Sequence, residues 1–285
     1  MQKIWVCGAR GQIGQAVNDV VDKLEFEMLD TDVDDLDVTD TDEVLRFGEM
    51  NRPDIIINCS GMTDISSCEE NPSQAFKVNA LGARNLAIVA AKMQAKMVQL
   101  STDDVFDGKS TEPYTEFDIT NPGTVYGKSK LAGENYVKEF TTKHFIVRST
   151  WVYGKGQNFI NGFLKKVDAG EQLSIASDQF GSPTSANELA RFLLHLVHTS
   201  EYGTYHATNK GVCSRYAFAQ EILKMTGKTA SMQPVPTVMS DFSKGRPAYA
   251  VLDNFIMSMV PIYDFPDWQD SLREYLEERG LYHAE

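Results

Sequence analysis

Short runs rich in β-branched and apolar residues alternate with helical patterns through the first half of the chain. Alternation of this kind predicts right-handed βαβ units around one doubly wound parallel sheet, an α/β fold. The run at 55–57 is apolar at every position, as in a strand that is covered on both faces. The predicted strands are 4–7, 26–29, 54–58, 96–100 and 145–148. The predicted helices are 12–23, 41–50, 72–94 and 124–140.

The pattern becomes less regular after about residue 150, where turn-rich pieces separate the predicted elements. Helices are expected at 159–169, 187–198, 215–225 and 268–279. We therefore assign residues 1–150 to the sheet domain, completed by part of 178–210, and residues 151–285 mainly to a second, smaller lobe. The chain would cross between the two. Ligands of open α/β sheets bind outside the carboxyl ends of the strands, and candidate site residues are sought there.

Composition limits what the chain can bind. The 285 residues carry 27 Lys and Arg against 40 Asp and Glu, a net charge of −13. Such an acidic surface repels nucleic acid and anionic membranes, so any bound phosphate must be held locally by backbone N–H groups or a few cations. The four cysteines lack CxxC spacing, which argues against zinc and disulfides and favours a reduced, cytoplasmic protein. No apolar run is long enough to span a bilayer, and the chain opens on a strand.

Three glycines, Gly8, Gly11 and Gly14, follow the first predicted strand and open the first helix. Their positions suit a Rossmann-type dinucleotide site. In such a site, one glycine makes the turn, one lets the backbone approach a pyrophosphate, and one lets helix and strand pack closely. The spacing is GxxGxxG rather than GxGxxG, and a plain tight turn is the simpler alternative. Asp30 ends the second strand, where an acidic residue would bind the ribose hydroxyls.

Residues near this loop give opposing signals on the cofactor. Asp30, with Asp32 nearby, should repel a 2′-phosphate and so favours NADH. Arg10 lies inside the glycine loop and could reach a 2′-phosphate, unless it serves only as a surface cation beside the nearby acids. We therefore expect both NADH and NADPH to be used. The acidic run that follows does not fit a calcium loop, because the sixth position from Asp32 is Asp37 rather than glycine.

Tyr126 and Lys130 lie four residues apart on a predicted helix and so share one face. A neighbouring ammonium lowers the pKa of a phenol, ordinarily about 10, and the pair can then exchange a proton with a substrate oxygen. No other tyrosine here is followed by lysine at this spacing, although a surface pair on an amphipathic helix is the alternative. Thr102 and its neighbours end a strand, where a hydroxyl could orient a carbonyl or simply cap a helix.

Together these features resemble the extended short-chain dehydrogenase/reductases, and within them the reductases of dTDP-4-dehydrorhamnose. The resemblance covers nearly the whole chain. It is carried by GARGQIG at 8–14, NCSG at 58–61, STDDVF at 101–106, YGKSKLAGE at 126–134, RSTWVYG at 148–154, DQFGSPT at 178–184 and Arg246-Pro247. The last three segments are more specific than the glycine loop, because they belong to the substrate side.

The resemblance implies a role for each matching residue. The cofactor would be bound by Gly8, Arg10, Gly11, Gln12, Ile13, Gly14, Asp30, Asp37, Val38, Gly61, Met62, Thr63, Tyr126 and Lys130. The catalytic residues would be Thr102, Tyr126 and Lys130. The sugar nucleotide would contact Thr102, Asp103, Tyr126, Trp151 and Arg246. In this scheme Trp151 flanks the sugar, and Arg246 pairs with the diphosphate as a guanidinium fork that matches phosphate geometry.

The chain departs from the family pattern at several positions. Asp104 stands where relatives usually have tyrosine, and DISSCE at 64–69 also differs from the usual segment, both near the sugar. Some relatives dimerise through magnesium held by glutamates. The matching positions here are Ala16 and Asn187, and so no metal site is predicted. Whether the chain forms a homodimer stays an open question.

The implied function is reduction of the 4-keto group of dTDP-4-dehydro-6-deoxy-L-mannose to dTDP-L-rhamnose, for polysaccharide synthesis. Tyr126 would protonate the developing alkoxide, Lys130 would lower the pKa of Tyr126 and hold the nicotinamide ribose, and Thr102 would orient the carbonyl. Two alternatives remain. One is another sugar-nucleotide epimerase, dehydratase or ketoreductase of the same fold, and the other is a non-catalytic binding subunit.

Overall fold

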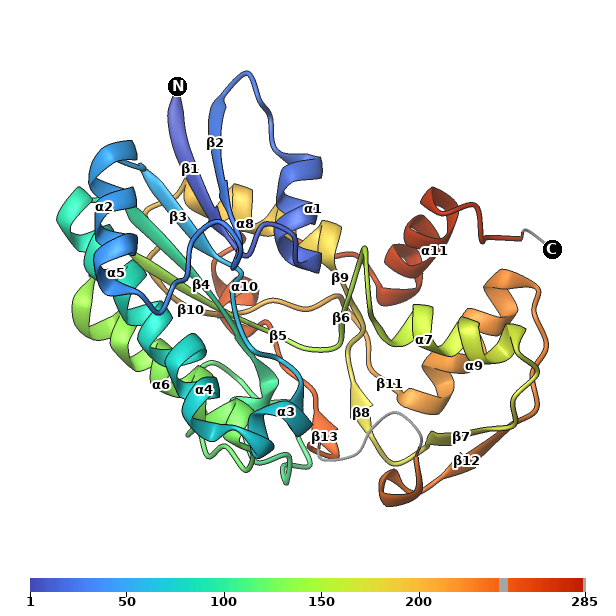
Figure 1. Ribbon diagram of the computed structural model, residues 1–285. Helices are drawn as coiled ribbons and strands as arrows, with labels where there is room; N and C mark the ends of the chain where they lie inside the picture. Colours follow the sequence, from blue (N-terminus) through green and yellow to red (C-terminus); the bar gives the residue numbers. More distant parts are fainter. Residues whose placement is uncertain (241–245, 284–285) are drawn as a thin grey trace.

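The computed structural model describes residues 1–240 and 246–283. Its largest sheet has six parallel strands in the order β10-β5-β4-β3-β1-β2 (Figure 1). The strands are β1 (Gln2–Cys7), β2 (Phe26–Thr31), β3 (Ile55–Asn58), β4 (Lys96–Thr102), β5 (His144–Ser149) and β10 (Gly203–His206). From β1 the chain adds β2 on one side and then crosses to β3 on the other. Ligands of open α/β sheets bind at such a reversal, beyond the carboxyl ends of the strands.

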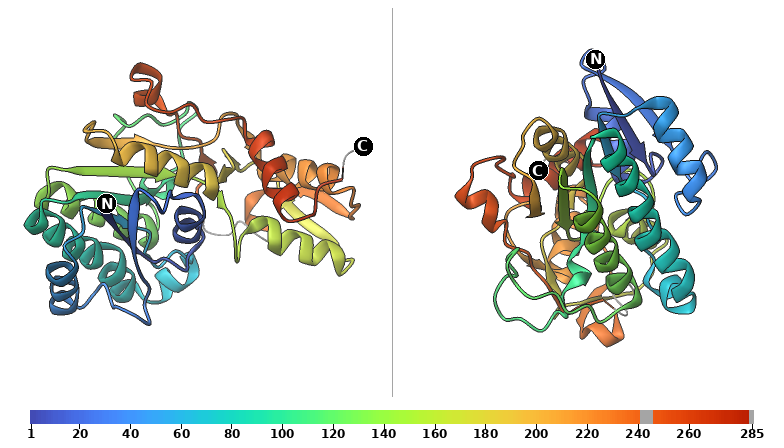
Figure 2. Two further views of the ribbon diagram at one scale, coloured as in Figure 1. Left: turned by 90° about the horizontal axis from the view of Figure 1, so that it is seen from above. Right: turned by 90° about the vertical axis from the view of Figure 1, so that its left-hand side faces the viewer.

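Helices cover both faces of this sheet (Figure 2). Along β3, Ile56 packs into one hydrophobic layer while Ile55 and Ile57 pack into the other, as the uninterrupted apolar run predicts. The first layer contains α2 (Thr41–Asn51), α5 (Ala83–Met93) and α6 (Val125–Phe140), and the second contains α1 (Gln12–Val20) and α8 (Ala186–Val197). The predicted α/β, Rossmann-type class is confirmed. No helix in the described parts of the chain is long and apolar enough to cross a membrane.

A smaller lobe, seen at the right of Figure 1, holds its own hydrophobic cluster. Its larger elements are α7 (Phe159–Asp168), β7 (Leu173–Ala176), α9 (Arg215–Thr226), β12 (Met232–Val235) and α11 (Trp268–Glu278). Short strands complete it: β6 (Val152–Tyr153), β8 (Phe180–Gly181), β9 (Thr184–Ser185), β11 (Cys213–Ser214) and β13 (Tyr249–Ala250). The remaining short helices are α3 (Ile65–Glu70), α4 (Pro72–Phe76), η2 (Asp103–Val105), η3 (Thr237–Met239) and α10 (Phe255–Met259). Between these pieces, α8 and β10 return to the large sheet.

The predicted helix 72–94 is not one α-helix. A π-helical turn, η1 (Lys77–Gly82), separates α4 from α5. Asn79 in this turn accepts a hydrogen bond from Met62 N at 2.8 Å and donates one to Ser129 Oγ at 2.9 Å. The predicted helix is confirmed as a helical segment from 72 to 93, but its π-helical turn was not predicted. A single inserted residue does not disturb apolar periodicity enough to be read from sequence.

Two further differences concern the ends and the short elements. The predicted helix 12–23 ends at Val20, because Val21 is extended and the Asp22 carboxylate accepts a hydrogen bond from Leu24 N in a turn. The sequence did not predict β10, a strand of four residues whose place at the sheet edge depends on pairing with β5.

Candidate active site

A cavity of about 810 Å³ lies between the carboxyl ends of the large sheet and the smaller lobe, and it gathers most of the predicted site residues. From the cofactor set it is lined by Arg10, Gly11, Gln12, Ile13, Gly61 and Thr63. From the catalytic and substrate sets it is lined by Thr102, Asp103, Tyr126, Lys130, Trp151 and Arg246. The predicted residues outside its lining are Gly8, Gly14, Asp30, Asp37, Val38 and Met62.

The glycine loop joins β1 to α1 and is built by close backbone approach. Gly8 has φ +78°, and a Cβ there would lie 2.7 Å from Ser60 N. A Cβ on Gly14 would lie 2.3 Å from the Gly8 carbonyl oxygen. Gly11 is the N-cap of α1 and offers no side chain to the first N–H groups of that helix. These groups, together with the positive end of the helix dipole, form a fitting cradle for a pyrophosphate.

Acidic residues surround Arg10 on the outer side of this loop. Its guanidinium forms ion pairs of 2.7 Å with Asp34 and 2.8 Å with Asp35, and its backbone N–H donates to Asp32. Arg10 therefore takes the role of a surface cation in this structure, one of the two roles considered from sequence. Asp30 is exposed at the end of β2, in the position predicted from the spacing.

Asp37 and Val38 lie beyond the cavity rim. Asp37 is exposed and accepts a hydrogen bond from Thr39 N. Val38 is buried, and its carbonyl accepts a hydrogen bond from the Asn85 amide of α5. Their predicted contacts with the adenine stay predictions.

Gly61 and Thr63 form another part of the cavity wall, and their segment is anchored by Asn79. The Asn79 amide donates to the Met62 carbonyl at 2.9 Å, while its oxygen accepts from Met62 N. A Cβ built on Gly61 would lie 3.0 Å from that same oxygen and 3.7 Å from Lys130 Nζ. The π-helical turn thus fixes the distance between this wall and the lysine.

Thr102, Tyr126 and Lys130 meet at the centre of the cavity. Thr102 ends β4, and its hydroxyl donates to Asp103 at 3.1 Å. Tyr126 and Lys130 lie one turn apart on α6, whose N-cap Thr124 accepts a hydrogen bond from Gly127 N. A Cβ on Gly127 would lie 2.0 Å from the Asp104 carbonyl, so glycine lets α6 approach the end of β4. The sequence prediction of a shared face for this pair is confirmed.

The protonation of Tyr126 differs from the sequence expectation. Burial raises the pKa of the phenol well above its ordinary value, and the Asp104 carboxylate raises it further, against the smaller influence of Arg246. The expected lowering by Lys130 is not found, because burial and the charges of Asp104 and Arg246 set the direction. Burial lowers the pKa of Lys130 itself to about 8. Tyr126 is consequently a neutral phenol at physiological pH, the form that can donate a proton.

A buried ion pair holds α6 against the sheet. Arg148 on β5 reaches Glu134 on α6 with two hydrogen bonds of 2.9 and 2.7 Å, and Ser101 Oγ donates to Glu134 at 2.6 Å. Burial would raise the pKa of Glu134, but the bonds from Arg148 outweigh it and keep the pKa below the ordinary value. Removing one member of such a pair typically costs about 3–5 kcal/mol. Sequence reasoning gave neither residue a role, since their pairing needs the sheet register.

Two carboxylates, those of Asp103 and Asp104, follow Thr102 directly. Arg246 Nη1 is 2.9 Å from Asp104 Oδ2, while Asp104 Oδ1 is buried without a hydrogen-bond partner. Burial, and after it the charge of Asp104, raise the pKa of Asp103 to about 7. The predicted bond from Arg246 to a diphosphate stays a prediction, because in this structure Arg246 is already bonded to Asp104.

Trp151 closes the cavity on the side of the smaller lobe. Its backbone has φ +49°, an unusual conformation for a bulky residue. A Cβ on Gly181 would lie 2.6 Å from the indole, and the guanidinium carbon of Arg215 lies 3.4 Å from an indole ring centroid. Sequence reasoning did not single out Arg215, which also lines the cavity. Its only signal was a cation at the start of a predicted helix.

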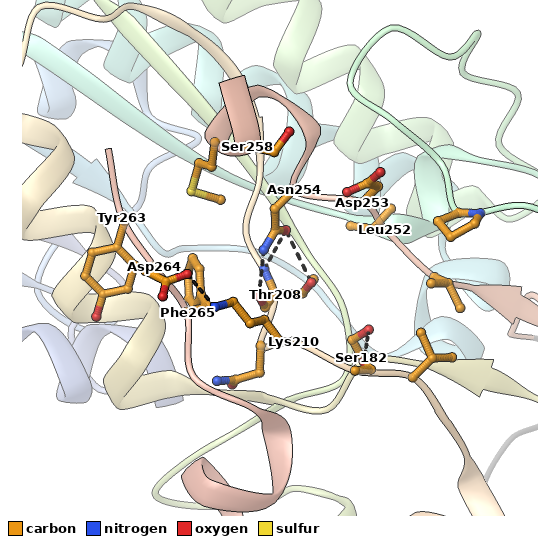
Figure 3. A pocket seen from close by; sticks show the side chains of 16 residues that line it. Ser182, Thr208, Lys210, Leu252, Asp253, Asn254, Ser258, Tyr263, Asp264 and Phe265 are labelled. Carbon is orange, nitrogen blue, oxygen red and sulfur yellow. Dashed lines mark hydrogen bonds and ion pairs between the residues drawn. The ribbon is translucent and has the colours of Figure 1, made fainter. Parts of the chain in front are cut away.

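A second cavity, of about 450 Å³, lies near α10 and the end of β10 (Figure 3). Several of its polar side chains are bonded to one another or to nearby backbone. Asn254 binds Thr208, Lys210 pairs with Asp264 at 2.5 Å, and Ser182 donates to the Gly211 carbonyl. Because these groups already have partners, we place the chemistry in the larger cavity.

The family model described as "RmlD substrate binding domain" matches residues 1–280. The chain belongs to this RmlD family. The family resemblance noted from the sequence is therefore confirmed. Among solved structures, the RmlD chain is similar to a dTDP-4-dehydrorhamnose reductase from Clostridium acetobutylicum, with a TM-score of 0.95 and 40% identity, covering 98% of this chain and 100% of that one.

Two other relatives of this RmlD chain match along almost their full lengths. A dTDP-4-dehydrorhamnose reductase from Bacillus anthracis, solved in complex with NADP, has a TM-score of 0.94 and 35% identity, covering 98% of this chain and 100% of that one. A spore coat polysaccharide biosynthesis protein of Bacillus subtilis is 35% identical over 281 residues, 98% of this chain and 99% of the relative. The whole RmlD chain, and not one lobe alone, is thus shared with these proteins.

Proposed function

We propose that this chain is an NAD(P)H-dependent oxidoreductase that reduces the 4-keto group of dTDP-4-dehydrorhamnose to give dTDP-L-rhamnose. The observation that carries the proposal is the meeting of Thr102, Tyr126 and Lys130 with the glycine loop in one cavity. The names of the relatives support the substrate, and the NADP complex of one of them supports the cofactor.

The residues present fit a dinucleotide. The glycine loop leaves no room for side chains, the N-terminus of α1 is open, and Gln12 Oε1 is buried without a partner. We assign the pyrophosphate to Gly11, Gln12 and Ile13, and the ribose next to the nicotinamide to Lys130. When bound, the cofactor supplies a hydride to the carbonyl carbon.

The chain's own residues prepare the carbonyl and supply the proton. Thr102 positions the carbonyl oxygen through its hydroxyl. Tyr126, a neutral phenol held in a buried position, donates its proton to that oxygen as negative charge develops there. Lys130 is charged below a pH of about 8 and stabilises the phenolate that this transfer leaves behind.

We assign the cofactor to residues 1–150 with part of 178–210, and the nucleotide sugar mainly to 151–285. The cluster that joins α8 and β10 to the large sheet supports this division, as does the separate cluster of the smaller lobe. A cytoplasmic location would suit such a biosynthetic enzyme. The homodimer stays a prediction, which sedimentation of the purified chain would check.

The assay incubates the protein with dTDP-4-dehydrorhamnose and each reduced nicotinamide, follows the loss of absorbance, and identifies the product. Tyr126→Phe should lower kcat by about 100-fold or more, because it removes the proton donor and keeps the ring. Binding of NADPH should change little. Tyr136→Phe is the matched control, since Tyr136 lies on the same helix, beside Phe140 and outside the cavity lining.

Turnover of Tyr126→Phe near that of the natural chain would contradict the mechanism. A nicotinamide cofactor that stays bound through dialysis, together with no consumption of added NADH or NADPH, would instead favour an epimerase or dehydratase. If the protein binds 4-keto sugar nucleotides but turns none of them over, the remaining alternative is a non-catalytic binding subunit.

A further inference from the structure

Arg215 stands apart from the other cations of the cavity. It is the first residue of α9, and it is only 7% exposed. Its guanidinium carbon lies 3.4 Å from an indole ring centroid of Trp151 and 4.7 Å from the ring centroid of Phe159. The two rings fix the plane of the guanidinium at the wall that the smaller lobe contributes.

Among the described residues, no carboxylate lies within ion-pair distance of Arg215, and the charge of Asp103 acts on it only from farther away. Within residues 1–240 and 246–283, its side chain forms no ion pair, and its Nε is buried without any hydrogen-bond partner. Burial, and after it the charge of Arg246, lower the pKa of Arg215 to about 9. A buried and unpaired cation costs free energy unless an anion joins it.

Two other arginines near the active site show the contrast. Arg148 is bonded to Glu134 through both oxygens of the carboxylate. Arg246 is bonded to Asp104. Of these three arginines, Arg215 is the one whose guanidinium can still donate hydrogen bonds to an anionic ligand. This matters in a protein whose net charge is −13, because few cations are available to bind a phosphate.

We propose that Arg215 binds the diphosphate of the nucleotide sugar, while Arg246 mainly holds Asp104 beside the catalytic threonine. A planar guanidinium that is held between aromatic rings loses little freedom when it binds two phosphate oxygens, and it matches their geometry. Trp151 would then act on the substrate through Arg215, since the guanidinium covers its ring. The inference rests on the proposed function for the identity of the nucleotide.

Binding measurements test this without turnover. Arg215→Gln should raise the Kd for dTDP about 10- to 100-fold, the loss expected for charge-assisted hydrogen bonds. The Kd for NADPH should stay within about twofold, because the pyrophosphate of the cofactor is assigned to the glycine loop. Thymidine, which lacks phosphate, should bind both proteins equally. Calorimetry with dTDP, NADPH and thymidine distinguishes the phosphates of the nucleotide sugar from those of the cofactor.

Arg84→Gln is the matched control, because Arg84 also lies over an aromatic ring, that of Phe140, but outside the cavity lining. Arg215→Lys keeps the charge without the planar fork, and should recover only part of the dTDP affinity. It also provides the measurement if Arg215→Gln does not fold.

Equal dTDP affinity in the natural chain and both Arg215 variants would overturn the inference, as would a matched loss of NADPH affinity. A chain that binds dTDP through Arg215 but reduces no sugar nucleotide would overturn the proposed function alone. Failure of the natural chain to bind dTDP at all would overturn both.

Discussion

The two halves of the active-site cavity are built from different materials. The half beneath the glycine loop is made of backbone: glycines in close approach, the open N-terminus of α1 and a segment held by Asn79. The half toward the smaller lobe is made of charged side chains, which come from the end of β4, the start of α9 and residue 246. The first half offers a rigid shape to a ligand, and the second offers charges whose balance changes when a ligand enters.

The difference indicates where each half is vulnerable. A backbone cradle tolerates no added volume, whereas a cluster of charges tolerates volume but depends on pH and on pairing. Substitutions in the two halves should therefore fail in different ways.

Gly14→Ala tests the backbone half and should have the largest effect. Its Cβ would lie 2.3 Å from the Gly8 carbonyl oxygen and 2.7 Å from Ala9 Cα, and so the loop must move. We expect kcat/KM with either cofactor to fall about 100-fold or more, as displacements of about 1 Å can cause. Gly123→Ala is the control, since a Cβ there meets nothing within 4 Å. Normal kinetics in Gly14→Ala would show that the loop is not rigid.

Asp103→Asn tests the charged half through the pH dependence of stability. The pKa of Asp103 is about 7 in the folded chain, above its ordinary value near 4. The folded state therefore holds this proton more tightly than the unfolded state, and its contribution to stability is complete below about pH 4 and lost as pH rises to about 7. Relative to Asp103→Asn, the natural chain should lose up to about 1.4 kcal/mol per pH unit across this interval.

Urea unfolding of both proteins at pH 5, 6 and 7 measures that difference. Asp118→Asn is the control, because hydrogen bonds from Thr115 lower the pKa of Asp118, whose titration then lies below this window. If the free energy of unfolding changes with pH in the same way for the natural chain and Asp103→Asn, the pKa of Asp103 is not raised in the folded chain.

Arg10 is the exception within the backbone half, and its effect should be the smallest. We expect NADH and NADPH to give kcat/KM values within about 30-fold of each other, or about 2 kcal/mol. Arg10→Ala should move the ratio toward NADH, but by less than that range, because the guanidinium must leave Asp34 and Asp35 to meet a 2′-phosphate. A double variant, Asp34→Asn with Asp35→Asn, should move the ratio toward NADPH. An unchanged ratio in both proteins would exclude Arg10 from cofactor choice.

The contrast between the halves also explains what the sequence could predict. The glycine loop, Asp30, and the pair Tyr126 and Lys130 are each defined by spacing within one or two elements, and the structure places them as expected. Arg215 and the ion pair of Glu134 with Arg148 depend on contacts between segments far apart in sequence, which no local pattern encodes. The altered pKa of Tyr126 depends on burial, which spacing alone does not reveal.

The π-helical turn at Lys77–Gly82 has a consequence for how this chain can change its length. One residue in a helix corresponds to a rotation of about 100°. Loss of a residue here would turn α5 by that angle and carry its buried Leu86 and Ala90 away from the sheet, besides releasing Asn79. An insertion or deletion in this segment thus has two effects. It rotates the buried face of α5 away from the core, and it displaces the wall of the cavity that Asn79 holds.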